Sequence, residues 1–474
     1  NNSRRLLFAS KNRAVAGLGR YGNLHVALSS CRVFPFFFDK LPPFTNPQTK
    51  LFLSSTSSSS CTNGSESSSN DTTTTTTDGI NPSSQFVSQL KGPIVNRLWT
   101  CREQAKQAVR DRGVIDVERP RPPSESVTKI GYPFSTDSFL KEQYRNPFGQ
   151  MRFGKVLEDL DALAGNIAFA HVQDPDLTIV TASVDRIRLS APPNLDVDQH
   201  LSGKVTFVGT SSMEIRMQCK ESEQADDPWM EAYFTFVAVD PETKRPLRIP
   251  PLDPQSWLER DQFEAGKRRA QARKEARKKL KNFEIPLDPD IEKQALTMLR
   301  EAYPLLNIPS LANPHAILVS QTKQQNCEIA QPQTKNLANQ IFGGFLMRRA
   351  FELAYATAYV FGGARPRFLE VDKVAFSIPV NVGDLTNYQS RVVYTEVKDE
   401  IRDFNAFRGQ KNVPLVSVEV EAWIVEPEKA SAKLSNRFMF TFALPSGTPC
   451  RRVLPSNMEE ARKMAMRHDL EKTL

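Results

Sequence analysis

The sequence predicts an α+β protein made of two copies of one unit, each an antiparallel sheet wrapped on a central apolar helix. Three landmarks occur twice in the same order: a helix opened by glycine, a strand-like segment containing Val-Asp, and the tripeptide Phe-Thr-Phe. Within each copy the apolar pattern changes from a helical to an alternating period. The length of 474 residues is also too great for one compact domain.

Each copy is predicted to begin with an apolar helix that follows a glycine, Gly154 in the first copy and Gly344 in the second. Large apolar residues recur behind both glycines at the three- and four-residue spacing of one helical face. They are Val156, Leu157, Leu160, Leu163, Ala164 and Ile167 in the first copy, and Leu346, Ala350, Leu353 and Ala354 in the second. Each helix therefore buries one stripe against a sheet.

The strands follow the helices. Segments 183–192 and 370–379 share Val-Asp, a basic residue, an aliphatic residue, Ser and Pro in register. Segments 213–220 and 416–422 alternate apolar and polar residues, as expected of strands with one buried face. Asp185 and Asp372, early in the strands, are predicted to have a structural role, pairing with Arg186 and Lys373.

The N-terminal part reads as a targeting leader. Residues 1–38 contain six Lys or Arg and no Asp or Glu, a composition typical of mitochondrial or plastid transit peptides. Residues 54–77 are Ser or Thr at eighteen of twenty-four positions, which is too polar to form a core. We expect 1–85 to be a transit peptide with a disordered linker, directed to the mitochondrial matrix, with a plastid as the alternative. A disordered regulatory tail is the competing interpretation.

The net charge of +8 is concentrated in two places. Residues 1–85 carry eight cations and four anions, and 267–281 carry nine cations and one anion, so the remainder sums to −4. No aromatic residues interleave with the second cluster, which argues against nucleic-acid binding. It is read as a solvated linker helix. No apolar run approaches the roughly 20 residues of a membrane-spanning helix, so no transmembrane segment is predicted.

The predicted layout has four further segments besides the leader and the linker. They are an N-terminal extension at 86–129, the first unit at 130–258, the second unit at 291–450 and a C-terminal helix at 451–474, with the basic linker helix at 259–290. Residues 456–459, Ser-Asn-Met-Glu, form a predicted capping box for the last helix.

These paired landmarks resemble the hotdog-fold acyl-coenzyme A thioesterases. The motifs that carry the resemblance are Arg-Asn-Pro-Phe at 145–148, the helical segment 157–165, Ile-Phe-Gly-Gly-Phe-Leu-Met-Arg at 341–348, and Val-Gly-Asp at 382–384. Two copies behind a transit-like leader resemble the mitochondrial double-hotdog, thioesterase nine-like branch, over roughly 130–445. The resemblance implies a tandem (double) hotdog fold.

The resemblance also implies an activity, the hydrolysis of acyl-coenzyme A to free fatty acid and coenzyme A without a cofactor or metal. It implies a homo-oligomer, either a trimer of double hotdogs or a dimer. A different class of function remains open, a non-catalytic double-hotdog scaffold that binds acyl-coenzyme A or lipid. Release of free thiol from acyl-coenzyme A would distinguish the two.

Asp161 is the predicted catalytic acid. With Leu157, Leu160 and Ala164 it occupies one helical face, whereas Glu158 and Asp159 point elsewhere. A carboxylate on an apolar stripe is costly unless it is paired or used, and burial would raise its pKa. A buried structural Asp is the alternative from the residues alone. The resemblance places the family's helix aspartate here, as general base or as nucleophile.

The second predicted element is the helix start around Gly344. Free amide N–H groups at a helix N-terminus can stabilise the oxyanion that forms during thioester hydrolysis. Asn339 precedes the double glycine; it is either a turn or cap residue, or the family's catalytic Asn, with Gln340 as the competing position. The resemblance implies that Gly343, Phe345 and Gln340 contact the substrate.

The two copies are not equivalent. Aligning Gly154 with Gly344 pairs Asp161 with Phe351, and we expect Gln150 to pair with Asn339. Because paired hotdogs build their sites across the interface, Asp161 with Asn339 and Gly344 forms one competent combination. The reciprocal combination, Gln150 and Gly154 facing Phe351, lacks a carboxylate unless the neighbouring Glu352 supplies one.

Overall fold

A computed structural model describes residues 92–113, 116–225, 227–281, 288–336, 340–372, 374–399, 401, 407 and 409–472. The predicted leader at 1–85 lies outside these residues, and so does Asn339. Among the helices that are described, none combines the length and the apolar character needed to cross a membrane.

The two copies contain the same elements in the same order. The first copy consists of β1 (Thr128–Tyr132), α4 (Phe153–Val172), β2 (Thr178–Leu189), β3 (Gln199–Val208), β4 (Ser212–Lys220) and β5 (Met230–Val239). The second consists of β7 (Gln324–Ile329), α7 (Gly343–Gly362), β8 (Arg367–Val371), β9 (Val374–Phe376), β10 (Leu385–Lys398), β11 (Val413–Glu426) and β12 (Ser431–Ala443). Both predicted central helices therefore begin one residue before the glycine that marks them, Gly154 in α4 and Gly344 in α7.

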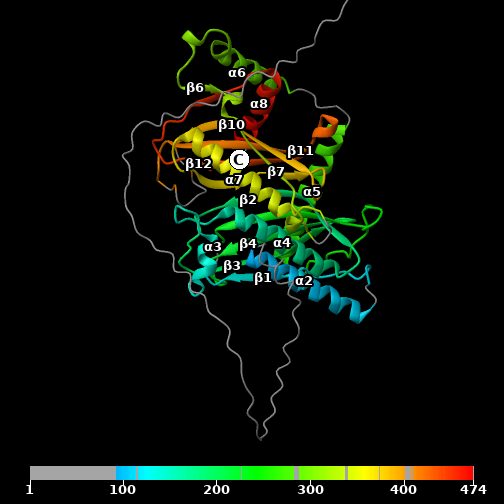
Figure 1. Cartoon of the computed structure of the whole chain (residues 1–474). Coiled ribbons are helices and arrows are strands. Elements are labelled where there is room, and N and C mark those ends of the chain that lie inside the picture. Colours follow the sequence, from blue (N-terminus) through cyan, green and yellow to red (C-terminus); the bar gives the residue numbers. More distant parts are fainter. Residues whose placement is uncertain are drawn as a thin grey trace, which may run out of the picture. The chain divides into compact units, whose positions relative to one another are not determined.

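The strands form one eleven-stranded sheet in the order β1-β3-β4-β5-β2-β8-β12-β11-β10-β7, with β9 pairing to β2 and β12. The order β1-β3-β4-β5-β2 recurs as β7-β10-β11-β12-β8. The copies join where β2 pairs antiparallel with β8 and β9. Helices α4 and α7 pack against each other and against the strands (Figure 1). This is the predicted tandem hotdog fold, with one antiparallel sheet wrapped on two central helices.

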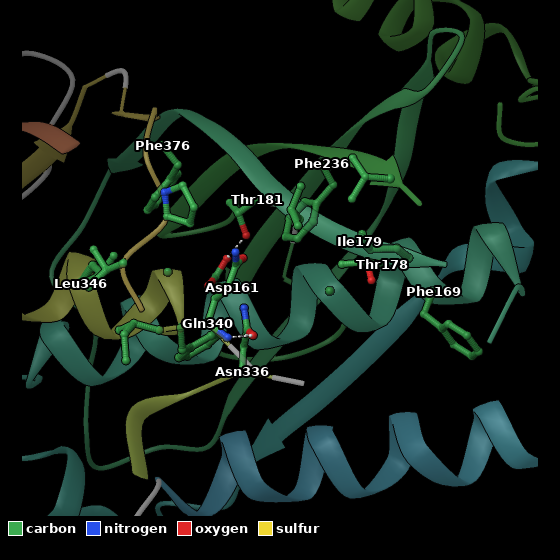
Figure 2. A pocket seen from close by; sticks show the side chains of 18 of the residues that line it. Asp161, Phe169, Thr178, Ile179, Thr181, Phe236, Asn336, Gln340, Leu346 and Phe376 are labelled. Carbon is green, nitrogen blue, oxygen red and sulfur yellow. Dashed lines mark hydrogen bonds between the residues drawn. The ribbon is translucent and has the colours of Figure 1, made fainter. Parts of the chain in front are cut away.

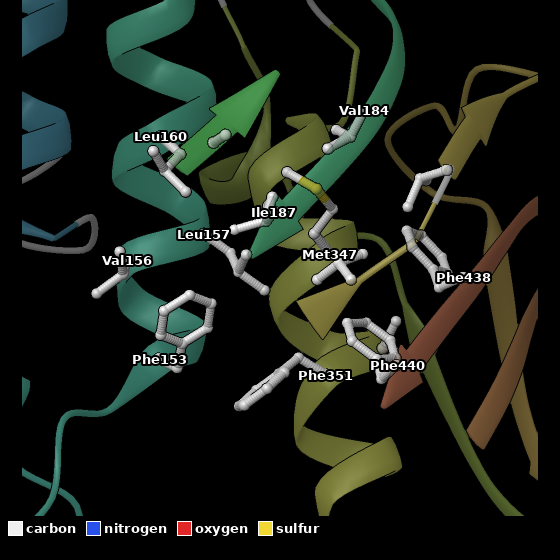
Figure 3. Close-up of a cluster of buried hydrophobic side chains, with 14 of the residues drawn as sticks. Phe153, Val156, Leu157, Leu160, Val184, Ile187, Met347, Phe351, Phe438 and Phe440 are labelled. Carbon is white, nitrogen blue, oxygen red and sulfur yellow. The ribbon is translucent and has the colours of Figure 1, made fainter. Parts of the chain in front are cut away.

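The core forms where the helical stripes meet the inward faces of the strands. Leu157, Leu160 and Leu163 of α4 are fully buried, and so are the Phe-Thr-Phe rings Phe234 and Phe440. Figure 3 shows α4 and α7 side by side, with apolar side chains of both helices between them, and the ring of Phe351 lies 5.7 Å from that of Phe440 in β12. The predicted apolar stripe is confirmed.

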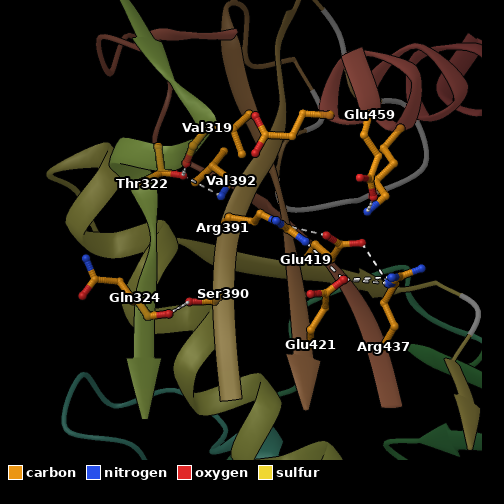
Figure 4. Close-up of polar contacts among 12 residues, drawn as sticks. Val319, Thr322, Gln324, Ser390, Arg391, Val392, Glu419, Glu421, Arg437 and Glu459 are labelled. Atoms are coloured by element: carbon orange, nitrogen blue, oxygen red, sulfur yellow. Dashed lines mark hydrogen bonds and ion pairs between the residues drawn. The ribbon is translucent and has the colours of Figure 1, made fainter. Parts of the chain in front are cut away.

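The repeat includes the 3-10 turns that precede the first strand of each copy, η1 (Pro123–Ser126) and η3 (Val319–Thr322). The Ser126 hydroxyl accepts a hydrogen bond from the Val205 amide at 3.0 Å in β3. The Thr322 hydroxyl accepts the equivalent bond from Val392 at 2.9 Å in β10 (Figure 4). The duplicated segment thus begins before β1.

Two helices cover the outward faces of the strands, α5 (Trp257–Lys281) and α8 (Met458–Lys472). Asp185 of β2 forms an ion pair with Arg273 of α5 at 2.5 Å, and Asp372 pairs with Arg467 of α8. The structural role of both aspartates is as predicted, but the partners differ. Arg186 instead pairs with Glu370 at 2.8 Å, because it points to the neighbouring strand β8.

The outer face of the second copy carries a cross-strand ion-pair network. Arg391 of β10 bonds to Glu419 of β11 at 2.9 Å and to Glu421 at 3.1 Å, and Arg437 of β12 bonds to the same two carboxylates (Figure 4). Alternation alone would place these glutamates in solvent. They are instead 5% and 7% exposed, which the paired arginines make tolerable.

The other described elements flank the duplicated core. They are α2 (Pro93–Arg112), α3 (Ser138–Tyr144), α6 (Pro289–Asn307), β6 (Ala316–Leu318), β13 (Arg452–Leu454), η2 (Pro309–Leu311), η4 (Pro332–Thr334) and η6 (Pro427–Lys429). Helix α2 packs on α4, and α6 packs on α8. The α8 capping box lies one residue later than predicted, since Asn457 caps the Glu460 amide at 2.9 Å.

Candidate active site

A cavity of about 340 Å³ lies where the N-terminus of α7 meets the middle of α4 and the start of β2. We call it the Asp161 cavity (Figure 2). Its lining comes from both copies and from helix α2. Asp161, Gly165 and Thr181 are contributed by the first copy, and Asn336, Gln340, Phe342, Gly343 and Leu346 by the second. The predicted construction across the two copies is therefore observed for Asp161 and Gly343.

Asp161 is held at two oxygens and is only 3% exposed. Its Oδ1 accepts a hydrogen bond from the Thr181 hydroxyl at 2.8 Å, and its Oδ2 accepts one from the Gly344 amide at 2.7 Å. Burial raises the pKa of Asp161 to about 6, whereas Thr181, Gly344 and the Arg102 cation act in the opposite direction. The group is ionised at neutral pH and has a proton affinity suited to a general base.

The double glycine lets α7 approach α4 closely. A Cβ on Gly344 would lie 2.8 Å from the Glu158 Cα and 2.7 Å from the Phe342 ring. A Cβ on Gly343 would lie 3.0 Å from Oδ2 of Asp161. The amides of a first helical turn lack intrahelical partners, so one of them can serve the carboxylate. The Gly344 amide, predicted to face the substrate, is thus turned to Asp161.

Helix α2 inserts a cation beside this carboxylate. The Arg102 guanidinium donates from Nε to Oδ1 of Asn166 at 2.7 Å and from Nη2 to the Ala162 carbonyl at 2.9 Å. A side chain on Gly165 would collide with it. Burial lowers the pKa of Arg102 to about 10, partly opposed by Asp161, so it remains charged at neutral pH. Sequence reasoning missed Arg102, which lies outside the repeat.

The loop before α7 supplies Asn336, a second residue that was missed. Its Oδ1 accepts a hydrogen bond from the Gln340 amide at 3.1 Å, and both side chains line the cavity (Figure 2). The predicted Asn339 falls between them and is not described. A signal was available, because Asn-x-x-x-Gln occurs at 146–150 and again at 336–340. Phe345 packs against the core; Phe342 and Leu346 line the cavity instead.

The hydrogen bonds also correct the alignment of the two loops. The Asn146 amide donates to the Gln150 carbonyl at 2.8 Å, and the Asn336 amide donates to the Gln340 carbonyl at 2.6 Å. Gln150 therefore corresponds to Gln340, and the predicted pairing of Gln150 with Asn339 is wrong. Both copies keep the Asn-containing loop. The copies therefore differ in the carboxylate, Asp161 against Phe351, and not in the loop asparagine.

Glu352 does not replace the missing acid of the reciprocal position. It accepts hydrogen bonds from Nε of Arg348 at 3.0 Å and from Nη2 of Arg152 at 3.2 Å. Although burial opposes its ionisation, these two arginines hold the pKa of Glu352 below its usual range. Phe351 itself is 7% exposed and packs among aromatic rings.

The other two acids of α4 are buried as well, contrary to the expectation that they point away from the core. Asp159 accepts hydrogen bonds from the hydroxyls of Tyr132 at 3.0 Å and Tyr144 at 2.5 Å, and burial raises the pKa of Asp159 to about 8. Glu158 pairs with Arg348 of α7 at 3.2 Å. Among these three acids, Asp161 alone lines the cavity.

Comparison with known proteins places the chain. No family model matches it. Acyl-coenzyme A thioesterase 2, chloroplastic, of Humulus lupulus is 38% identical over 411 residues, 82% of this chain and 91% of the relative. Acyl-coenzyme A thioesterase 4, mitochondrial, of the same plant is 38% identical over 413 residues, 82% and 75% of the two chains. Human acyl-coenzyme A thioesterase 9, mitochondrial, is 32% identical over 347 residues, 70% and 74%.

Solved structures with a similar arrangement of elements include a putative oleoyl thioesterase from Lactobacillus plantarum. It is 9% identical, covers 67% of this chain and 96% of its own, and has a TM-score of 0.41. The two Humulus lupulus relatives are similar enough in sequence, over enough of their length, to decide the family. The chain belongs to the acyl-coenzyme A thioesterase family.

Proposed function

We propose that the protein hydrolyses acyl-coenzyme A to a free fatty acid and coenzyme A in the Asp161 cavity. The observation that carries the proposal is the buried Asp161 carboxylate, fixed by an amide of the opposite copy at the wall of a cavity. Membership of the thioesterase family supports the substrate class. The non-catalytic scaffold alternative provides no reason for a desolvated carboxylate that is held at both oxygens.

Asp161 acts on the thioester carbonyl, directly or through water. As a general base it takes a proton from a water molecule whose oxygen bonds to the carbonyl carbon. The C–S bond then breaks, and the proton passes to the departing thiolate of coenzyme A. As a nucleophile, a carboxylate oxygen of Asp161 would bond to that carbon while the C–S bond breaks, so that an anhydride forms and the coenzyme A thiolate leaves. Water then hydrolyses the anhydride, which releases the fatty acid, restores Asp161 and supplies the proton that the thiolate takes up. In both cases Thr181 and Gly344 fix the carboxylate in place.

The second copy supplies the groups that face the developing negative charge. Gly343 is the first residue of α7 and lines the cavity, so its amide is the oxyanion donor we propose. The side-chain amides of Asn336 and Gln340 orient the thioester or the attacking water. Gly344 and Phe345 are given no direct substrate contact in this arrangement.

Cations at the cavity suit the anionic substrate. Lys106 of α2 and Lys244 line it together with Arg102, and we propose that the two lysines receive phosphates of coenzyme A. The basic helix α5 is a weaker candidate. Its Arg269 pairs with Glu214 at 2.6 Å, and its Arg273 is held by Asp185, so both cations bind the sheet.

The proposal extends to site number, location and assembly. Phe351 in place of the acid supports one working site per chain. Residues 1–38, which contain six Lys or Arg and no Asp or Glu, support import into the mitochondrial matrix; their composition suits a plastid as well. Exposed apolar residues on and after α6 support a homo-oligomer, a trimer of double hotdogs or a dimer. They are Leu296, Tyr303, Leu306 and Leu311, 44%, 56%, 43% and 73% exposed.

The test is thiol release from acyl-coenzyme A by wild-type protein and two matched amide variants. Asp161→Asn should lower kcat by about 10²-fold or more, the usual contribution of a general base. Glu352→Gln, the same chemical change on the other central helix, should retain most of the activity. A fully active Asp161→Asn enzyme contradicts the assignment, and a wild-type protein that releases no thiol favours the scaffold.

A further inference from the structure

A second cavity, of about 370 Å³, lies at the reciprocal position between the two copies. It is lined by the 146–152 loop, the start of α4, the middle of α7 and β8. Its volume falls within the range of small-molecule sites. We call it the Phe351 cavity, since Phe351 occupies the place that Asp161 has in the first cavity.

Three positions of the first cavity have aromatic counterparts in the second. The helix alignment that pairs Asp161 with Phe351 also pairs Gly165 with Tyr355. Thr181 lies opposite Phe236 on the neighbouring strand, and Phe368 lies opposite Phe442, and both of these neighbours end a Phe-Thr-Phe tripeptide. Thr181 of the first copy therefore corresponds to Phe368 of the second. The acid, the hydroxyl that holds it and a glycine of α4 have thus all become aromatic residues. The second cavity is similar in size to the first, but aromatic side chains stand where the first has its carboxylate and hydroxyl.

The aromatic residues form continuous apolar walls. The rings of Phe153 and Phe368 lie 4.4 Å apart, and those of Phe351 and Phe368 lie 5.1 Å apart. Leu189 and Pro192 extend this lining. The nearby carboxylate, Glu352, is held by arginines and does not act as a base. The walls suit a hydrocarbon chain and offer no group that would hydrolyse a thioester attached to that chain.

Polar groups in this cavity favour an anionic or carbonyl head group. The Tyr355 side chain lines the cavity with its ring, since its hydroxyl is itself buried away from solvent. Arg152 and Arg367 line the cavity as well; Arg367 is exposed and the Arg152 side chain is 41% exposed. Cations therefore stand at the rim of an apolar pocket.

We propose that the Phe351 cavity binds a fatty acyl chain carrying an anionic head group and holds it without hydrolysis. An intact acyl-coenzyme A and a free fatty acid share this chemistry. The proposal does not depend on catalysis in the Asp161 cavity, because it concerns binding alone.

The test is equilibrium binding to the full-length wild-type protein, measured by calorimetry. The probes are a non-hydrolysable thioether analogue of decanoyl-coenzyme A and, separately, decanoate. We expect the thioether analogue to fill the Asp161 cavity in every case and a second molecule, analogue or decanoate, to fill the Phe351 cavity. Displacement of the second analogue molecule by decanoate identifies the free acid as the preferred source, and resistance to it identifies the coenzyme A ester. One analogue molecule per chain and no decanoate binding would overturn the proposal.

Matched variants assign each molecule to its cavity. Pro192→Trp fills the second cavity from an exposed position, and Pro379→Trp is the equivalent change in the Asp161 cavity. Pro192→Trp should abolish binding of the second molecule, in the Phe351 cavity, and leave the analogue bound in the Asp161 cavity. Pro379→Trp should have the opposite effect. Arg367→Met, which removes an exposed cation at the rim, should weaken binding in the second cavity about twofold to fivefold. Unchanged binding in both Pro192→Trp and Arg367→Met refutes the assignment, and thiol release by wild type reports on catalysis separately.

Discussion

Replacing Asp161, the carboxylate that we propose to be catalytic, by its neutral isostere asparagine should inactivate the enzyme and at the same time stabilise its fold. Burial raises the pKa of Asp161 from 3.8 to about 6. One pKa unit corresponds to about 1.4 kcal/mol, so the ionised carboxylate costs the folded state about 3 kcal/mol. Asparagine removes the charge and keeps one oxygen for the Gly344 amide, while its NH₂ can donate to the Thr181 hydroxyl.

The sign follows from linkage. The folded-state pKa lies above the unfolded one, so the cost is absent below about pH 4 and is fully developed above about pH 6. Asp161→Asn should therefore exceed wild type in stability by about 1–3 kcal/mol at pH 7.5, allowing for weaker hydrogen bonds to a neutral group. The advantage should shrink to roughly half between pH 7.5 and pH 5.

The assay is urea-induced unfolding of both proteins at pH 5 and pH 7.5, with thermal unfolding as a second readout. Glu352→Gln is the control. Although burial opposes ionisation, Arg348 and Arg152 hold the pKa of Glu352 below its usual value, so its charge stabilises the fold above pH 4.5. That variant should be less stable than wild type at pH 7.5. An Asp161→Asn protein that is less stable than wild type at pH 7.5, or equally offset at both pH values, would refute the reasoning.

Three further predictions follow from the same contacts. The acid limb of kcat/KM for wild type should lie near pH 6; Arg102→Met should move it to higher pH and Arg102→Lys should not, as measured by pH profiles of thiol release. Asn336→Asp keeps the oxygen that accepts from the loop amide but removes the NH₂ donor, so kcat should fall about 10²-fold with little change in melting temperature. Asp185→Asn removes the nearer of the two carboxylates that pair with the largely buried Arg273 of α5, and Glu214 at 3.6 Å remains. Denaturant unfolding should therefore show a loss of no more than about 3 kcal/mol with the kinetics retained.

The duplication and the helical stripe could be predicted from sequence because they rest on local periodicity. Leu157, Leu160 and Leu163 follow a 3.6-residue period, and that period needs no knowledge of the partner elements. Asp161 could be singled out for the same reason, since it interrupts an apolar face. The position of a residue on its own helix is a local property.

Partners supplied by distant segments could not be predicted in this way. Thr181 reaches Asp161 only because β2 crosses α4, and Arg102 comes from a helix outside the repeat. The helical wheel places Glu158 and Asp159 off the face of Asp161, yet residues of α7, β1 and α3 enclose them. Each case depends on which tertiary element covers a given face, and a single-helix pattern does not contain that information.

Comparing the two copies separates residues that serve the fold from residues that serve the chemistry. Asp185 and Asp372 are present in both copies, and each binds an arginine from the helix that covers its strand, so the repeated acid is structural. Asp161 occurs once, and where it is absent the surrounding polar groups have become aromatic. Asn336 belongs to both classes. Its oxygen closes a loop that the first copy also closes, which accounts for the repeat, while its side chain lines the cavity whose carboxylate only one copy has. Persistence of the loop therefore carries no evidence for a second catalytic site, and the missing acid supports our proposal of one working site per chain.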